Sequence, residues 1–147
     1  MSSTREKVGR VVTGAGMVAA LPSVWQTVTH ITDDTYRAPE ARDGAGHVQY
    51  HMAREALITA GSLAAVGIGV LAGPRRGREL WGAMAAAGAG FAAAMWSGGP
   101  TTGVWAPNRK AFAVHVASTA GLVAGVWLLR PERGRAGVER TDRRSGA

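Results

Sequence analysis

Residues 111–129 read AFAVHVASTAGLVAGVWLL, nineteen residues with no Asp, Glu, Lys or Arg among them. A helix needs about 20 such residues to span the hydrocarbon core of a bilayer, within a range of roughly 17 to 25. His115 is the one ionisable group in this run. The run therefore predicts a transmembrane helix.

Three further apolar runs precede this one in the 147-residue chain. Residues 11–29 and 56–73 carry no charged side chain, and residues 80–96 read LWGAMAAAGAGFAAAMW. A soluble helical bundle would show a polar stripe on every helix, because the outer face of each helix meets water. The 80–96 run has no such stripe, although its many Ala and Gly residues make it weakly hydrophobic for a transmembrane span. We therefore predict an all-α fold, a bundle of four transmembrane helices over about residues 8–29, 48–73, 80–97 and 110–129.

Basic residues flank these runs and give the predicted bundle an orientation. The chain carries 17 Lys and Arg against 10 Asp and Glu, a formal net charge of +7. If four helices alternate in direction, twelve of the basic residues fall on one side: Arg5, Lys7, Arg10, Arg75, Arg76, Arg78, Arg130, Arg133, Arg135, Arg140, Arg143 and Arg144. The positive-inside rule then places both chain ends in the cytoplasm of a multi-pass protein of the cell membrane. A nucleic-acid-binding domain would gather its basic residues on one folded face, so we predict no nucleic-acid partner.

The two ends of the chain need separate interpretation. The first residues also fit a signal peptide cleaved near residue 20, because an apolar run follows Arg10 and contains the small-residue sequence Val18-Ala19-Ala20. The apolar run continues beyond Pro22, which favours a retained first helix kinked at this proline. Residues 131–147, rich in Arg and Gly, are predicted to be a disordered basic tail after a membrane domain of residues 1–130, and this tail suits anionic lipid headgroups.

Small residues recur at every fourth position in three of the runs. Helices in lipid associate through close backbone approach at such positions. These ladders predict tight packing, and a ladder that faces outward would suit a homo-oligomer or a membrane partner. Their members are Gly61, Ala65, Gly69 and Gly73; Gly82, Ala86, Gly90, Ala94 and Gly98; and Ala113, Ala117, Gly121 and Gly125.

All four histidines fall in the predicted extracytoplasmic half of the bundle. His30 follows the first run, His47 and His51 open the second with Glu55 one turn further on, and His115 lies early in the fourth. Residues four apart share a helix face, so His47, His51 and Glu55 form one stripe. An ionisable side chain at the centre of the bilayer costs at least about 2.5 kcal/mol. We therefore expect this stripe and His115 to face each other across a cavity open to the outside.

Two kinds of chemistry suit such a cavity. His30, His47, His51, Glu55 and His115 are candidate ligands for a divalent metal, since two His and one carboxylate fit Zn or Fe(II) and His alone fits Cu. Alternatively, His51, Glu55 and His115 are candidate catalytic acid and base groups near neutral pH. A third interpretation is that the histidines only hydrogen-bond loop backbone at the wet membrane interface.

The histidine pattern consists of Thr29-His30-Ile31, a polar loop and then His47-Val48-Gln49-Tyr50-His51. It resembles that of a family of small four-helix membrane proteins of unknown function. In that family a TH pair after the first span precedes an HxxFH-type motif. The resemblance covers about residues 8–129 and depends on the histidine spacing, with Asp33, Asp34 and Tyr36 standing where the family has Asn and Trp. It implies a four-helix membrane fold and no established activity.

Three functional classes remain open at this point. The first is a membrane enzyme, metal-dependent or acid/base, that acts on a lipid-like or isoprenoid substrate. The second is a non-catalytic accessory or structural membrane subunit, and the third is a transporter or proton relay. The inner halves of the four runs carry no charge, which disfavours the third class. The absence of cysteine excludes a Cys nucleophile and thiolate metal ligands.

Overall fold

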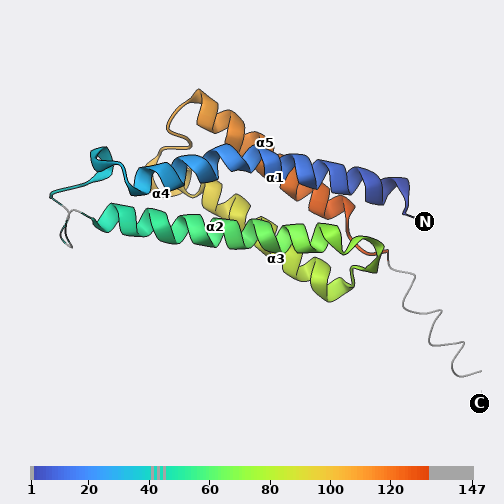
Figure 1. The fold of residues 1–147 in the computed structure, drawn as a ribbon. Helices are drawn as coiled ribbons and strands as arrows, with labels where there is room; N and C mark the ends of the chain where they lie inside the picture. Colours follow the sequence, from blue (N-terminus) through green and yellow to red (C-terminus); the bar gives the residue numbers. More distant parts are fainter. Residues whose placement is uncertain (1, 41, 43, 45, 133–147) are drawn as a thin grey trace, which may run out of the picture.

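The structure is a computed structural model that describes residues 2–40, 42, 44 and 46–132. Within this part of the chain there is no strand, and the prediction of an all-α protein is confirmed. The long helices cover the four apolar segments singled out in the sequence. They are α1 (Thr4–Ile31), α2 (His47–Leu71), α3 (Arg78–Trp96) and α5 (Arg109–Leu128), with η1 (Asp34–Tyr36), η2 (Gly73–Arg75) and the one-turn α4 (Gly98–Thr102) in the connections (Figure 1).

Three helices in the described chain, α1, α2 and α5, are long and apolar enough to cross a membrane. The 20 residues of α5 rise about 30 Å, which matches the thickness of the hydrocarbon core. The 19-residue α3 is not among the three, because it begins with Arg78 and Glu79 and is built largely from weakly apolar Ala and Gly. This pattern is consistent with a membrane protein, while the fourth span and the orientation stay predictions.

Local sequence sets where the helices begin and end. The Ser3 hydroxyl accepts the Glu6 backbone N–H at 3.2 Å and the Asn108 side chain accepts the Ala111 N–H at 2.9 Å, so α1 and α5 begin at capping side chains. Gly73 follows α2 with a φ of +56°, a backbone conformation that favours glycine. α1 continues through Pro22 as a single helix, although proline removes one backbone donor there.

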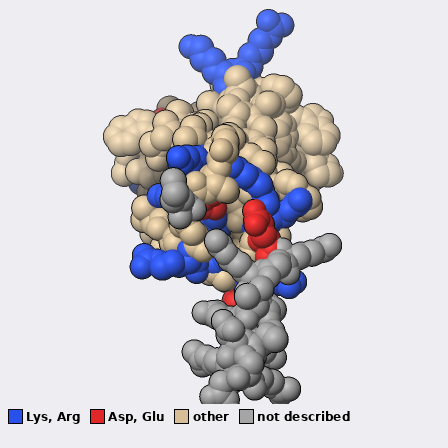
Figure 2. Space-filling view, turned by 90° about the vertical axis from the view of Figure 1, so that its right-hand side faces the viewer, with Lys and Arg blue, Asp and Glu red and all other residues tan. Residues whose placement is uncertain are grey.

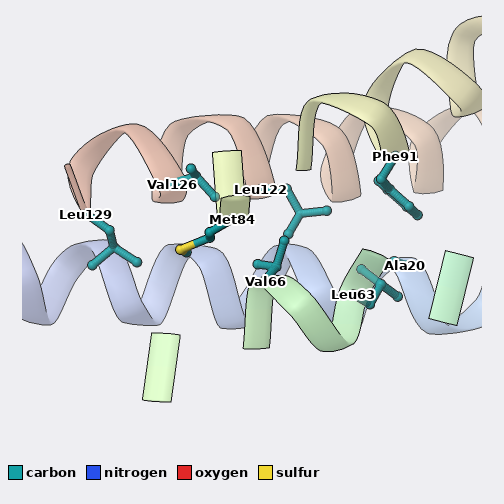
Figure 3. Packing of buried hydrophobic residues seen from close by; sticks show 8 residues of the cluster. All are labelled: Ala20, Leu63, Val66, Met84, Phe91, Leu122, Val126 and Leu129. Carbon is teal, nitrogen blue, oxygen red and sulfur yellow. The ribbon is translucent and has the colours of Figure 1, made fainter. Parts of the chain in front are cut away.

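The helices form a bundle in which α1 packs most extensively against α5, α2 lies against α1 and α3, and α3 closes against α5. The core runs along the bundle axis and contains Ala20, Leu63, Val66, Met84, Phe91, Leu122, Val126 and Leu129 (Figure 3). The starts of α1 and α3 and the ends of α2 and α5 share one end, which we call the arginine end (Figure 1). All four histidines lie toward the opposite end, which we call the histidine end.

The interface between α1 and α5 is built on small residues. A Cβ on Gly16 would lie 2.6 Å from the backbone nitrogen of Leu122, and one on Gly121 would lie 2.7 Å from the Cα of Gly16. Gly125 packs against Thr13 just as closely. Two members of the α5 ladder therefore pack as expected, against a set of small residues on α1 that the sequence analysis had not singled out: Gly9, Thr13, Gly16 and Ala20.

The other two ladders are only partly packed. On α2, Gly69 lies against Met84, but a Cβ on Gly61 would meet nothing within 4 Å. On α3 the ladder faces outward, since Gly82 and Gly90 are also open on that side, and Met84, Gly88 and Phe91 form the buried face instead. Larger apolar side chains therefore decide which faces of α2 and α3 are buried.

Candidate functional site

The structure separates the candidate site residues of the sequence analysis into groups. His47 and His51 lie next to each other on α2, with their Nε2 atoms 3.0 Å apart. His30 and His115 line one pocket between α1 and α5. Glu55 is exposed on α2 and lies in neither place.

The expected cavity shared by His51, Glu55 and His115 does not form, and this expectation is wrong. His51 is exposed on α2 like Glu55, because α2 packs through a face that carries Leu63 and Val66. The prediction assumed that the small-residue ladder was the packing face and that the histidine stripe looked inward. The bulkier apolar side chains pack instead, since burying them against α1 and α3 excludes more lipid and gains more dispersion contact.

The five candidate metal ligands are likewise not brought together. Within the described residues, no group of three or more His, Asp or Glu side chains is placed to hold a metal ion. The His47–His51 pair supplies two imidazoles at most, whereas zinc sites in proteins use at least three protein ligands. A metal centre built from this set stays a prediction that the described geometry does not support.

The pocket between α1 and α5 at the histidine end has a volume of about 370 Å³, and we call it the histidine pocket. This volume falls within the range of small-molecule sites, roughly 300–1,000 Å³. Its walls combine apolar side chains with several hydrogen-bonding groups. The lining residues are Pro22, Ser23, Gln26, Thr27, His30, Pro107, Asn108, Lys110, Ala111, Val114 and His115.

His30 is positioned by the connection that follows α1. Its ring stacks on the ring of Tyr36, with the centroids 3.8 Å apart. Tyr36 belongs to η1, and the Asp33 carboxylate caps this turn by accepting the Thr35 hydroxyl at 2.7 Å and the Thr35 backbone N–H at 2.9 Å. These two hydrogen bonds hold the pKa of Asp33 below its ordinary value, with a smaller contribution from the nearby His30.

His115 is positioned by an aromatic wall. Its ring lies nearly perpendicular to the ring of Trp96, with the centroids 5.5 Å apart, and Trp96 also contacts Trp105 and Phe112. The indole N–H of Trp96 donates to the Thr119 hydroxyl at 3.2 Å, which fixes the plane of the ring. The wall therefore holds the imidazole of His115 in one orientation at the pocket.

The buried Nδ1 atom of His115 has no hydrogen-bond partner among the described residues. A buried polar atom without a partner costs about 1–3 kcal/mol. Because this atom is buried, it does not itself face the pocket, and His115 lines the pocket with the rest of its ring.

The sequence analysis missed the contribution of α1 and of Lys110 to this pocket. A signal was available, because Ser23, Gln26, Thr27 and His30 recur at spacings of three and four and therefore share one face of α1. Lys110 was not among the candidate site residues of the sequence analysis. It lines the pocket beside the two imidazoles.

Comparison of the chain with protein-family models, with curated proteins and with solved structures found no match. The functional interpretation therefore depends on the fold and on the geometry of the pocket.

Proposed function

We propose that this protein is a multi-pass protein of the cell membrane that binds an amphiphilic molecule in the histidine pocket. Its termini would lie in the cytoplasm, since basic residues at the arginine end include Arg5, Arg10, Arg75 and Arg130. The histidine pocket would then open on the extracytoplasmic side.

The observation that carries this proposal is the convergence of His30 and His115, from opposite ends of the chain, on one pocket with Lys110. Pro22 and Val114 give the same pocket apolar wall. A pocket with a few convergent polar groups on mostly apolar walls is the usual form of a small-molecule site.

The depth of the pocket supports an amphiphilic ligand. The 28 residues of α1 extend over about 42 Å, more than the roughly 30 Å of the hydrocarbon core. His30 lies in the last turn of α1 and therefore falls near the headgroup layer. A ligand in this pocket would place its polar group near His30 and Lys110 and its apolar part toward the bilayer.

The lining of the pocket also limits which side chains could act as catalytic acid and base groups. Its lining residues include no Asp or Glu, so acid/base chemistry there would depend on the two imidazoles. Glu55, exposed on α2, is removed from that role.

The experiment is identification of molecules that copurify with the detergent-solubilised protein, by mass spectrometry of an organic extract. His30→Ala/His115→Ala removes both imidazoles from the pocket, and His47→Ala/His51→Ala is the matched control outside it. We expect one amphiphile near equimolar amount in the wild type and in the control, and about tenfold less in the pocket variant, the effect of losing roughly 1.4 kcal/mol of hydrogen bonding. Equal amounts in both variants would show that the pocket does not hold the molecule.

A second candidate function is that of an accessory subunit that docks another membrane helix. The outward-facing Gly82 and Gly90 favour it, because a Cβ on either would meet nothing within 4 Å. These open positions leave room for the backbone of another helix to approach α3 closely. Gly82→Leu/Gly90→Leu should then abolish chemical cross-linking to a partner or a second copy, and unchanged cross-linking would exclude this face.

A further inference from the structure

A second pocket lies at the arginine end, and the proposed function makes no use of it. It has a volume of about 540 Å³, and we call it the arginine pocket. The pocket is surrounded by the start of α1, the start of α3, the end of α5 and three residues that follow α5. Its lining residues are Arg5, Arg78, Trp81, Trp127, Arg130, Pro131 and Glu132.

The arginine pocket carries an excess of positive charge. Three guanidinium groups line it against the single carboxylate of Glu132. In the described part of the chain, ion pairs join Arg37 to Asp34 and Arg76 to Glu6, so Arg5, Arg78 and Arg130 are not neutralised by a described carboxylate. Figure 2 looks onto this end and shows basic side chains around the face, with carboxylates grouped near its centre.

Contacts within the fold hold the walls of the pocket in place. The Arg5 guanidinium donates to the backbone carbonyl of Arg130 at 3.0 Å, which ties the start of α1 to the end of α5. The Arg130 guanidinium lies 4.4 Å from the centre of the Trp127 ring, and the Trp81 indole N–H donates to the Val126 carbonyl at 2.9 Å. The two indoles and two of the three guanidiniums are therefore preorganised.

The start of α3 adds to the field in this pocket. Gly77 begins the helix without a side-chain hydrogen bond, so the first N–H groups of α3 and the positive end of its dipole face the arginine end. Glu79 in the first turn offsets part of this charge. The balance still favours an anion, because three arginines face Glu79 and Glu132.

An apolar stripe leads away from the arginine pocket along α5. Trp127 is 60% exposed, Val123 is 55% exposed and Val116 is 43% exposed. Their spacings of four and seven place them on one face of the helix. α5 is long and apolar enough to cross a membrane, and in that position this stripe would face the acyl chains. Tryptophan at the end of such a helix favours the headgroup boundary.

We propose that the arginine pocket binds the phosphate of an anionic phospholipid, whose acyl chain lies along the Val116–Val123–Trp127 stripe. Arginine suits this role because its planar guanidinium donates two parallel hydrogen bonds to phosphate oxygens. Free phosphate shares the headgroup chemistry, but it would leave the exposed apolar stripe unused. This proposal depends on α5 crossing the membrane and is independent of the histidine pocket.

Native mass spectrometry of the detergent-solubilised full chain tests this proposal. The protein is titrated with dioleoylphosphatidylglycerol and, separately, with dioleoylphosphatidylcholine, which differ in headgroup charge but not in acyl chains. Arg5→Gln/Arg78→Gln/Arg130→Gln removes the three charges, and Arg37→Gln/Arg54→Gln/Arg109→Gln removes three charges from the histidine end. A third variant, Arg5→Lys/Arg78→Lys/Arg130→Lys, keeps the charges and separates lost binding from lost folding.

We expect wild type and the histidine-end control to bind phosphatidylglycerol more tightly than phosphatidylcholine. The glutamine variant of the pocket should lose affinity for phosphatidylglycerol by about 100-fold, since each basic side chain near a membrane surface contributes about fivefold. The lysine variant should bind phosphatidylglycerol with an affinity between those of the wild type and the glutamine variant, because it keeps the charges and loses the paired hydrogen bonds of the guanidinium. About 10 mM inorganic phosphate should not displace the lipid, because it cannot replace the apolar contacts along α5.

Three results would overturn the proposal. The first is equal affinity of the wild type for the two lipids. The second is an equal loss in the glutamine variant and in the histidine-end control, which would assign the preference to overall charge. The third is complete displacement by inorganic phosphate, which would make the pocket a site for a soluble anion.

Discussion

Gly16 of α1 and Gly121 of α5 touch backbone to backbone, so closely that a Cβ on Gly121 would lie 2.7 Å from the Cα of Gly16. No side chain separates the two helices at this point. In a bilayer, where lipid tails are as apolar as the core, such close approach is a main source of attraction between helices. The pair therefore sets the distance between α1 and α5, and with it the width of both pockets, which these helices help to line.

Gly16→Ala should destabilise the bundle by about 1–3 kcal/mol, the usual cost of forcing extra volume into a packed interface. The clash is with the backbone of Gly121 and Leu122, which cannot rotate away. Gly14→Ala is the control on the same helix, because a Cβ there meets nothing within 4 Å and alanine favours the helix. Unfolding in detergent, followed by far-ultraviolet circular dichroism, measures both. A Gly16→Ala variant as stable as Gly14→Ala would contradict the close contact.

The Arg76 side chain is almost fully buried and joins three helices at the arginine end. Its guanidinium donates to the Gly69 carbonyl at 2.6 Å, to the Leu129 carbonyl at 3.2 Å and to the Glu6 carboxylate at 2.8 Å. Arg76→Ala should destabilise the protein by about 3–5 kcal/mol, because it leaves the mostly buried Glu6 carboxylate without its partner.

Arg75 provides the control for this prediction, since it is the neighbouring arginine and is exposed. Arg75→Ala should change the free energy of unfolding by less than about 0.5 kcal/mol, as substitutions at ordinary surface positions do. Glu6→Gln should be milder than Arg76→Ala, because it removes the carboxylate charge and keeps the arginine bonds to the two carbonyls. Equal effects of Arg76→Ala and Arg75→Ala on unfolding would show that the buried pair does not stabilise the fold.

The apolar runs predicted the helices well, because helix positions in such a chain follow from uncharged length and from the caps at Ser3 and Asn108. They predicted the contacts poorly. Apolar residues surround α5 and the middle of α1, so no polar stripe there marks which face packs. The decisive feature is that Gly16 and Gly121 have no side chain. Small-residue spacing alone could not separate these from the open positions Gly82 and Gly90.

The candidate site was predicted in part for a related reason. The sequence placed the histidines toward one end of the bundle, and His30 and His115 do line one pocket. The inward orientation of His51 did not follow, since that depended on knowing which face of α2 packs. The burial of Arg76 could not be predicted for the same reason. In the sequence, Arg75 and Arg76 are adjacent arginines in one connection, and nothing there distinguishes the buried one from the exposed one.

Asp33 should titrate below its ordinary pKa of 3.8, because the ionised carboxylate accepts two hydrogen bonds from Thr35. Its contribution to stability is then fully present above pH 3.8 and is lost as the pH falls through the lowered pKa. Carboxyl carbon chemical shifts of Asp33, followed by NMR against pH, measure this directly. Thr35→Val removes the hydroxyl donor and should raise the pKa of Asp33 toward 3.8. An unchanged pKa in Thr35→Val would exclude the hydroxyl as its cause.

Single cysteines can establish how many helices cross the membrane, since the chain has no cysteine of its own. We expect Ser2→Cys and Pro74→Cys to react with a membrane-impermeant maleimide from one side, and Thr35→Cys and Thr101→Cys from the other. Position 74 precedes α3 and position 101 follows it, so this pair reports on α3 alone. Labelling in intact cells and in inverted vesicles distinguishes the two sides.

The alternative outcome for these cysteines is equally specific. If α3 lies along the interface or is held only by the other helices, positions 74 and 101 would label from the same side. That side would then hold the residues before and after α3, while α1 and α2 still cross. Positions 35 and 101 would then label from opposite sides, so His30 and Lys110 would not share a side, and this result would contradict the histidine pocket. Opposite labelling of positions 74 and 101 would instead establish four spans and place the arginine pocket with Ser2 and Pro74.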